Sequence, residues 1–256
     1  MPSSTTISRQ SAPFTDALGS GGQPRIIPGD TLQETAVFAA FDRVYIDVPS
    51  PHDAIAEYAT LLGVVADGSR LSLANLDICL RGDTETAAIA GLNLLDTALP
   101  PATEQVVSTG EMPIQLAASN YRSPDYRSTD STTGIYAVDH IVLQTRDADA
   151  CIALFRDQLG LRLALDQAVP EWGGRMLFFR HGKMTLEVIQ NLKEPPPRDF
   201  FWGITYLCHN IDETIELLDV RGVAHSPIRE GRKPGTRVAT IKSHALGLPT
   251  LIIGPA

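Results

Sequence analysis

A basic segment near the C-terminal end is the first group of residues with evident binding chemistry. The segment SPIREGRKPGTRVATIK sets five cations against the single acid Glu230, in a chain whose formal net charge is −9. Gly, Pro and Gly at 231, 234 and 235 predict a loop with defined turns, and TRVATIK then predicts a strand. Guanidinium groups on such a loop suit a carboxylate, a phosphate or a CoA-like anion, because arginine offers bidentate donors. The alternative is a solvated turn that only offsets nearby acids. The cations are Arg229, Arg232, Lys233, Arg237 and Lys242.

Within this segment we expect Arg237 to point inward as the main anion anchor, because it opens the strand. Arg229, Arg232 and Lys233 are the further candidates for binding an anionic substrate. Two tryptophans, Trp172 and Trp202, are candidates for lining the same pocket, with a role in the core as the alternative. Gly203 follows Trp202 and would leave room for a ligand.

The remaining histidines and cysteines carry weaker signals. Four histidines fall in predicted turns, loops or helix starts and are expected to be exposed, whereas His244 precedes the last strand and is a candidate nitrogen ligand. The three cysteines are far apart and form no CxxC pair, so neither a disulfide framework nor a structural zinc site is expected. The sequence shows no glycine-rich phosphate loop, nucleophile elbow or Cys–His nucleophile pair. The four histidines expected to be exposed are His52, His181, His209 and His225.

Composition limits the class of protein. With 256 residues and 43% hydrophobic residues, the chain is long enough for one large or two medium globular domains. No apolar run reaches the roughly 20 residues of a membrane helix, and no signal peptide is expected at the start. The acidic net charge argues against nucleic acid as a partner. We therefore expect a cytoplasmic protein that binds a small anionic molecule and not a membrane.

The elements that must position these groups are clearest in AVDHIVLQTRDADACIALFRDQLGL. Alternation over residues 138–145 predicts a strand with both faces partly buried. Asp147 or Asp149 can cap a following helix that ends at Gly160. Two strands, residues 176–180 and 184–190, follow and are joined by a tight turn.

The same order of strand, helix and further strands recurs along the chain. It begins again at residues 203–208 and, earlier, at residues 43–48. A weaker copy lies between the module that starts at residue 43 and the strand at residues 138–145. We therefore predict an α+β fold of tandem β-α-β-β-β modules, paired into cupped mixed sheets with helices on the outside. The predicted organisation is a flexible leader at 1–35, a degenerate N-terminal module pair at 36–130 and a C-terminal pair at 131–256.

The stretch VDHIVLQTRDADACIALFRDQLGL followed by LEVIQ resembles the vicinal-oxygen-chelate superfamily of glyoxalases, bleomycin-resistance proteins and extradiol dioxygenases. The resemblance extends over residues 41–256 and is strongest in the last two modules. It implies that His140 and Glu187 take the family's ligand positions, on the first and last strands of the third module. It also implies a divalent metal (Fe, Mn, Ni, Zn or Mg) that acts on neighbouring substrate oxygens.

The other three modules depart from this pattern. Alignment places Gly203 opposite His140, and Ile252 or Leu251 opposite Glu187, so the fourth module lacks metal ligands. The first module has Arg43 and Asp77 at the two positions, and the second has Gly91 and Gln115. A complete metal centre would need further ligands, for which His244 and Asp77 are the candidates.

Three interpretations of His140 and Glu187 remain open: a metal site completed by other groups, metal-free acid–base chemistry, and a structural histidine beside a relic glutamate. The leading expectation is a glyoxalase-like enzyme that catalyses an isomerase, epimerase or lyase step next to a carbonyl. This step could proceed with or without a metal. The alternatives are an iron(II) extradiol-type dioxygenase and a non-catalytic, resistance-type binding protein. A homodimer is compatible with each of them.

Overall fold

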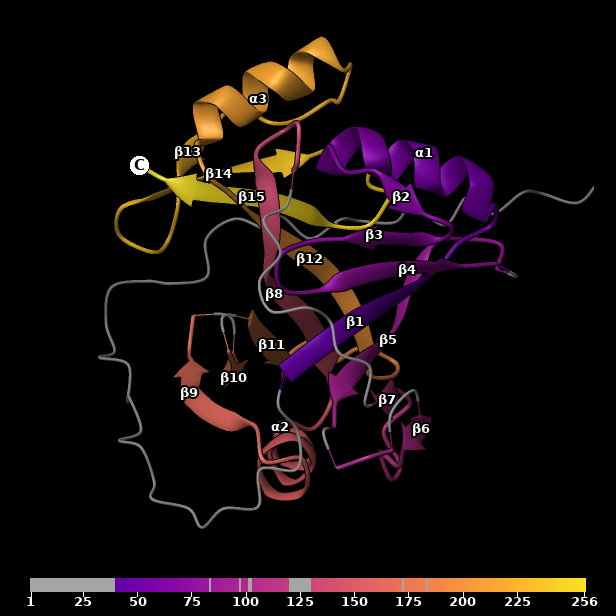
Figure 1. Cartoon of the computed structure of the whole chain (residues 1–256). Coiled ribbons are helices and arrows are strands. Elements are labelled where there is room, and N and C mark those ends of the chain that lie inside the picture. The colour runs from indigo at the N-terminus through magenta and orange to yellow at the C-terminus, as the bar shows by residue number, and fades with distance from the viewer. Residues whose placement is uncertain are drawn as a thin grey trace, which may run out of the picture.

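The computed structural model describes residues 40–82, 84–96, 98–100, 103–119, 130–171, 173–182 and 184–256. The predicted leader at 1–35 and the predicted pocket residue Trp172 lie outside these ranges. Strands dominate and helices are few, which confirms the predicted α+β class (Figure 1). No helix in these ranges is both long enough and apolar enough to cross a membrane.

The first module has the predicted order of strand, helix and three strands, and its sheet runs β2-β3-β4-β1 with β1 and β4 parallel. Ser50 caps the helix by accepting a hydrogen bond from the Asp53 amide. Gly63, with φ +68°, ends the helix in the left-handed conformation that glycine adopts easily. The elements are β1 (Ala40–Asp47), α1 (Pro51–Leu62), β2 (Ala66–Asp67), β3 (Arg70–Ser72) and β4 (Asp77–Arg81).

The second module is reduced. It contains β5 (Ala88–Leu95), β6 (Glu104–Val107) and β7 (Gln115–Ser119), with β7 parallel to β5 and antiparallel to β6. The described residues between β5 and β6 form no helix. This agrees with the weak repeat signal in this part of the sequence.

The third module matches the strongest part of the repeat, and its sheet runs β9-β10-β11-β8 with β8 and β11 parallel. Asp147 is the helix cap and accepts from the Ala150 amide at 3.0 Å. The helix continues as a π-helix, and Gly160 with φ +68° follows its last turn. The elements are β8 (Ile135–Thr145), α2 (Ala148–Ile152), η1 (Ala153–Gln158), β9 (Arg162–Val169), β10 (Gly174–His181) and β11 (Met184–Asn191).

The fourth module repeats this arrangement, with β15 parallel to β12 and β14 antiparallel to β15. Asn210 caps its helix by accepting from the Asp212 amide at 3.0 Å. The elements are β12 (Phe200–Cys208), α3 (Ile211–Val220), β13 (Arg229–Glu230), β14 (Thr236–Ile241) and β15 (Thr250–Pro255).

Consecutive modules pair through their first strands. β1 lies antiparallel to β5, and β8 lies antiparallel to β12 over most of its length. The two halves meet in the sheet at one pair, Ile89 with Phe201. At one end of the molecule, Arg221 after α3 donates to the Thr60 carbonyl of α1 at 3.2 Å, while α2 lies at the other end (Figure 1).

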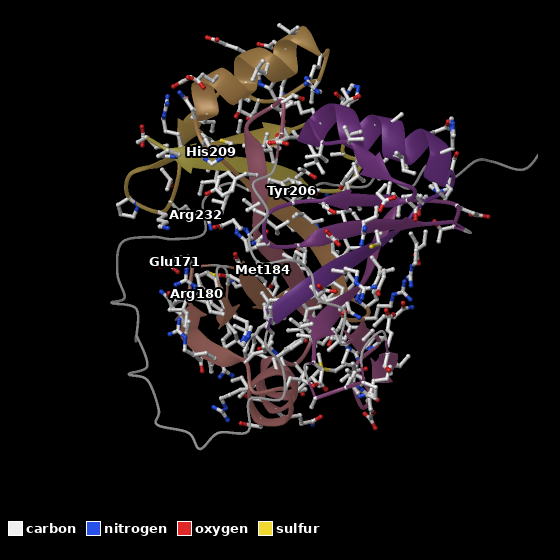
Figure 2. All side chains as sticks on the ribbon, viewed as in Figure 1. Glu171, Arg180, Met184, Tyr206, His209 and Arg232 are labelled. Carbon is white, nitrogen blue, oxygen red and sulfur yellow. The ribbon has the colours of Figure 1, made fainter. Side chains whose placement is uncertain are left out.

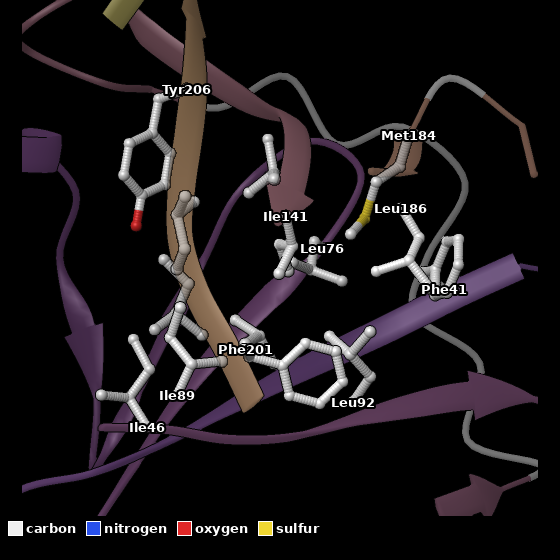
Figure 3. Close-up of a cluster of buried hydrophobic side chains, with 14 of the residues drawn as sticks. Phe41, Ile46, Leu76, Ile89, Leu92, Ile141, Met184, Leu186, Phe201 and Tyr206 are labelled. Atoms are coloured by element: carbon white, nitrogen blue, oxygen red, sulfur yellow. The ribbon is translucent and has the colours of Figure 1, made fainter. Parts of the chain in front are cut away.

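The buried apolar side chains form one continuous cluster that extends through both halves and includes Met184 and Tyr206 (Figure 2, Figure 3). On the C-terminal sheet, Phe179 of β10 is fully buried, with its ring centroid 5.3 Å from that of Phe155 in η1. Successive strand residues alternate between faces. Phe178 therefore points to the face away from the helices, which we call the open face.

Gly203 is required for close packing and does not leave room for a ligand as we expected. A Cβ atom at this position would lie 2.7 Å from the Pro249 carbonyl oxygen and 3.1 Å from the Pro249 Cβ. Pro249 precedes β15, and its carbonyl accepts the amide of Ile204 at 3.0 Å. The space beside Gly203 is therefore filled by the chain itself.

We predict that Gly203→Ala lowers the free energy of unfolding by about 1–3 kcal/mol, because the added methyl group overpacks against a hydrogen-bonded backbone. Urea denaturation measures the change. The matched control is Gly82→Ala, whose Cβ would meet only the Pro51 side chain at 3.5 Å. Equal stability of the two variants would contradict this account.

Candidate functional site

A β-bulge in β8 directs Asp139 and His140 toward one another. In the pairing with β12, Thr205 faces His140 and Tyr206 faces Val138, so Asp139 is the extra residue. In a regular strand, neighbouring side chains point to opposite faces, and the bulge removes this alternation. As a result, Asp139 Oδ2 lies 2.8 Å from Nδ1 of the adjacent His140.

The other ring nitrogen of His140 faces groups from two neighbouring strands. Thr205 of β12 places its Oγ1 2.9 Å from Nε2, and Glu187 of β11 places Oε2 3.6 Å from the same nitrogen. Glu187 pairs with Val142 of β8 and with Phe178 of β10, so it points to the open face. The structure therefore brings together the two residues that the sequence singled out, His140 and Glu187.

Burial and charge shift the acidity of both groups. Each side chain is only 17% exposed. Burial alone would lower the pKa of His140, but the hydrogen bond that its Nδ1 donates to Asp139 and the charges of Glu187 and Asp139 raise it above its ordinary value. Burial raises the pKa of Glu187, and the positive charges of His140 and Arg232 offset part of this increase. The pair is suited to exchanging a proton with a ligand.

The donor set does not fit a divalent metal within the described part of the chain. No group of three or more His, Cys, Asp or Glu side chains there is arranged to hold a metal ion. His140 and Glu187 supply only two ligands. Protein metal sites of this type usually take three or more such ligands.

The two additional ligands that we predicted from the sequence lie elsewhere. Asp77 is buried in β4 and forms an ion pair with Arg70 at 3.5 Å, and β1, β5 and β12 separate β4 from β8. His244 bonds Ser243 through Nδ1 at 2.9 Å, in the loop between β14 and β15. The same loop contacts α1 through the Leu246 amide and Glu57.

The strand register also corrects the alignment of the modules. Glu187 lies two residues after Thr185, the partner of His140. In the first module Asp77 is the partner of Arg43, so the residue equivalent to Glu187 is Cys79. Burial raises the pKa of the Cys79 thiol to about 11, which keeps it protonated at neutral pH.

Our expectation that Arg237 points inward is wrong. Arg237 pairs with Gly254, whose missing side chain would lie 3.2 Å from Ile211 of α3, so this face carries the helix. Its guanidinium binds both carboxylate oxygens of Asp212, in the first turn of α3. Asp212 is near because the first turn of α3 packs over the start of β14. Its carboxylate neutralises Arg237 on the helix face, away from the candidate site.

Three other cations of the basic segment are not bound to the helix face as Arg237 is. Arg232 is exposed in the loop between β13 and β14, and its charge lowers the pKa of Glu187 (Figure 2). Lys233 lines an open pocket of about 280 Å³ together with Asp139 and Tyr136. Arg229 is exposed on β13.

The aromatic candidates are less directly tied to the site. Trp202 is partly buried in β12, where it is the extra residue of a second bulge, between Phe201 and Gly203. Tyr136, which lines the pocket, stacks on exposed His209 with ring centroids 4.1 Å apart. The exposure of His209 confirms the prediction made for that residue.

Two residues of the site were missed from the sequence. The alternating pattern predicts Asp139 on the opposite face from His140, because a bulge leaves no mark in such a pattern. Thr205 enters only through the antiparallel pairing of β8 with β12, which joins two modules. The sequence carried no signal for either one.

Comparison with known proteins places this fold. Residues 139–240 match the model of the Glyoxalase/Bleomycin resistance protein/Dioxygenase superfamily. No curated protein sequence matches the chain.

Solved structures show a similar fold at low sequence identity. A mutant of 4-hydroxymandelate synthase from Streptomyces coelicolor is 14% identical, with a TM-score of 0.61 over 86% of this chain and 93% of that one. A fusion of a xylose isomerase-like TIM barrel with 4-hydroxyphenylpyruvate dioxygenase is 12% identical, with a TM-score of 0.57 over 86% and 50%. Methylmalonyl-CoA epimerase from Mycobacterium tuberculosis is 17% identical, with a TM-score of 0.42 over 50% and 94%.

The matched region contains residues 139–145 of β8 with the bulge residue Asp139, Glu187 and the basic loop, and the fold extends the likeness over both module pairs. Through residues 139–240, the chain is therefore similar to the glyoxalase, bleomycin resistance protein and dioxygenase superfamily.

Proposed function

We propose that the protein is a glyoxalase-like enzyme that moves a proton next to a carbonyl group of a small anionic molecule. The observation that carries this proposal is the contact of His140 and Glu187 on the open face, 3.6 Å apart, with Asp139 on the far nitrogen of His140. A carboxylate beside a cationic imidazole supplies a base and an electrophile at one place.

In the proposed reaction, Glu187 takes the proton from the carbon next to the carbonyl. The electrons of the broken C–H bond form a carbon–carbon double bond, and the carbonyl oxygen gains negative charge. Protonated His140 donates a hydrogen bond from Nε2 to this oxygen. Return of the proton to the other face, or to another carbon, gives an epimerase or an isomerase step, and loss of a neighbouring group gives a lyase step.

The surrounding groups support these roles. Asp139 stabilises the charged imidazole, in the way that a carboxylate orients a catalytic histidine. Thr205 holds the ring from the other side through its hydroxyl. A raised pKa favours a glutamate that accepts a proton more readily, and a histidine that keeps its proton to higher pH than a free imidazole does.

The described donor set favours this proposal over an iron-dependent dioxygenase. Such enzymes hold iron with two histidines and one carboxylate. Here one histidine and one carboxylate converge, and the described residues offer no third ligand group. No step of the proposed reaction requires a metal.

Loss of the base is expected to abolish proton exchange. We predict that Glu187→Gln slows exchange of the proton next to the carbonyl by about 100-fold or more. The measurement follows, by proton NMR in D2O, a panel of carbonyl compounds that carry carboxylate or phosphate groups. His140→Asn is expected to slow exchange of the same compounds.

The matched control is Glu216→Gln, which changes an exposed glutamate on α3 and should leave exchange unchanged. Exchange by Glu187→Gln at the wild-type rate would contradict the role of Glu187. A panel without any exchange, but with compounds that bind, would favour the non-catalytic alternative. Oxygen uptake with catechols would favour the dioxygenase.

A second prediction concerns acidity. Asp139→Asn is expected to lower the pKa of His140, because it removes a hydrogen bond and a charge that both raise it. A pKa that is raised in the folded state adds stability below the unfolded value, and this stability is lost as pH rises through the folded value. The stability deficit of Asp139→Asn should therefore shrink as pH rises above about 6.5, the ordinary value for histidine.

NMR titration of the imidazole protons measures this pKa, with His140→Asn to assign the signal. Asp212→Asn is the control, because Asp212 binds Arg237 on the helix face. An identical His140 titration in wild type and Asp139→Asn would refute the positioning role of Asp139.

A further inference from the structure

A row of side chains crosses five neighbouring strands on the open face and includes His140. Register pairs Thr205 of β12 with His140 of β8, and His140 with Thr185 of β11. Thr185 faces Arg180 of β10, and Arg180 faces Arg162 of β9. Residues opposite one another in adjacent strands point to the same face. The row therefore ends in two arginines on the face that holds the candidate site.

These two arginines form a like-charge pair. Like charges directly opposite in a sheet destabilise it. Both residues are exposed, and within the described ranges no ion pair joins either guanidinium to a carboxylate. The contact made by Arg180 is to a neutral group, with Nε 3.4 Å from Thr185 Oγ1.

The helix face of the same strand shows the contrast. Arg175, also on β10, has the opposite orientation and is neutralised by Asp166 and Asp149, each at 2.7 Å. The Arg175 side chain is 27% exposed, so it is more buried than that of Arg180. Acids are paired with the arginine on the helix face and are missing beside the arginines on the open face of the described sheet.

A further guanidinium group near the site comes from the fourth module. Arg232, on the loop between β13 and β14, lies close enough to Glu187 to lower its pKa. Figure 2 shows Arg232 and Arg180 on the same side of the molecule. Guanidinium groups from two modules therefore flank the His140–Glu187 pair.

We infer that Arg162 and Arg180 bind a doubly charged oxyanion, of the kind that a phosphate ester carries, at the non-reacting end of the substrate. Two forked donors match the geometry of such a group, and the anion removes the repulsion between them. The strands of His140 and Arg180 are two spacings apart, roughly 10 Å. The anionic group would then be several bonds from the carbonyl. This inference rests on the proposed function only where it places the reacting end of the substrate at His140 and Glu187.

Binding of inorganic phosphate tests the site without knowledge of the substrate. We predict that the double variant Arg162→Ala/Arg180→Ala binds phosphate at least 10-fold more weakly than wild type by isothermal titration calorimetry. Arg180→Lys should lie between the two, because it keeps the charge and loses the fork. Arg156→Ala, which changes an exposed arginine paired with Asp157 on η1, should bind phosphate as wild type does.

Stability separates binding from a structural role. Without phosphate, the double variant should resist urea at least as well as wild type, because a repulsion is removed. Unchanged phosphate affinity in the double variant would overturn the inference, and so would a loss of affinity that Arg156→Ala shares. Lower stability without phosphate would also overturn it.

The two proposals can fail independently. Glu187→Gln should still bind phosphate although it no longer exchanges protons. Phosphate binding that depends on the two arginines, in a protein without exchange activity, would leave this inference standing and remove the proposed function. Exchange activity without phosphate binding to the two arginines would remove this inference and leave the proposed function standing.

Discussion

The antiparallel contact of β8 with β12 is the constraint on which the rest of the C-terminal half depends. It joins two modules into one sheet, and it brings Thr205 to His140. Its irregular register produces the bulge that directs Asp139 to the imidazole. Parallel pairing of β8 with β11 then adds Glu187. Asp139, His140, Glu187 and Thr205 are thus held by backbone hydrogen bonds of central strands, which gives the candidate site a rigid support.

The N-terminal half keeps the geometry of this site with different chemistry. Asp42 is the extra residue of a bulge in β1, and its carboxylate binds Nε of the next residue, Arg43, at 2.7 Å. Asp139 and His140 have the same relation in β8. Arg43 also contacts Glu104 at 3.2 Å, so its charge is used inside an ion-pair network. The bulge is a property of the module, and the identity of the next side chain decides whether it can transfer a proton.

Much of the fold could be predicted from the sequence because it depends on local patterns. Alternation, helix caps and the glycine at 160 define the third module, and their recurrence reveals the fourth. The site was only partly accessible. His140 and Glu187 could be identified by resemblance, whereas Asp139 and Thr205 depend on a bulge and on pairing between modules. Arg237 was misjudged because its partner, Asp212, comes from a helix whose distance to the strand no sequence pattern encodes.

The contact between Gly203 and Pro249 restricts how the site can change by mutation. Gly203 occupies the position in the fourth module that His140 occupies in the third. A histidine there would have to displace the Pro249 carbonyl, which bonds the Ile204 amide. A single substitution of Gly203 by histidine could therefore not add a second ligand beside His140, because the loop before β15 would also have to move.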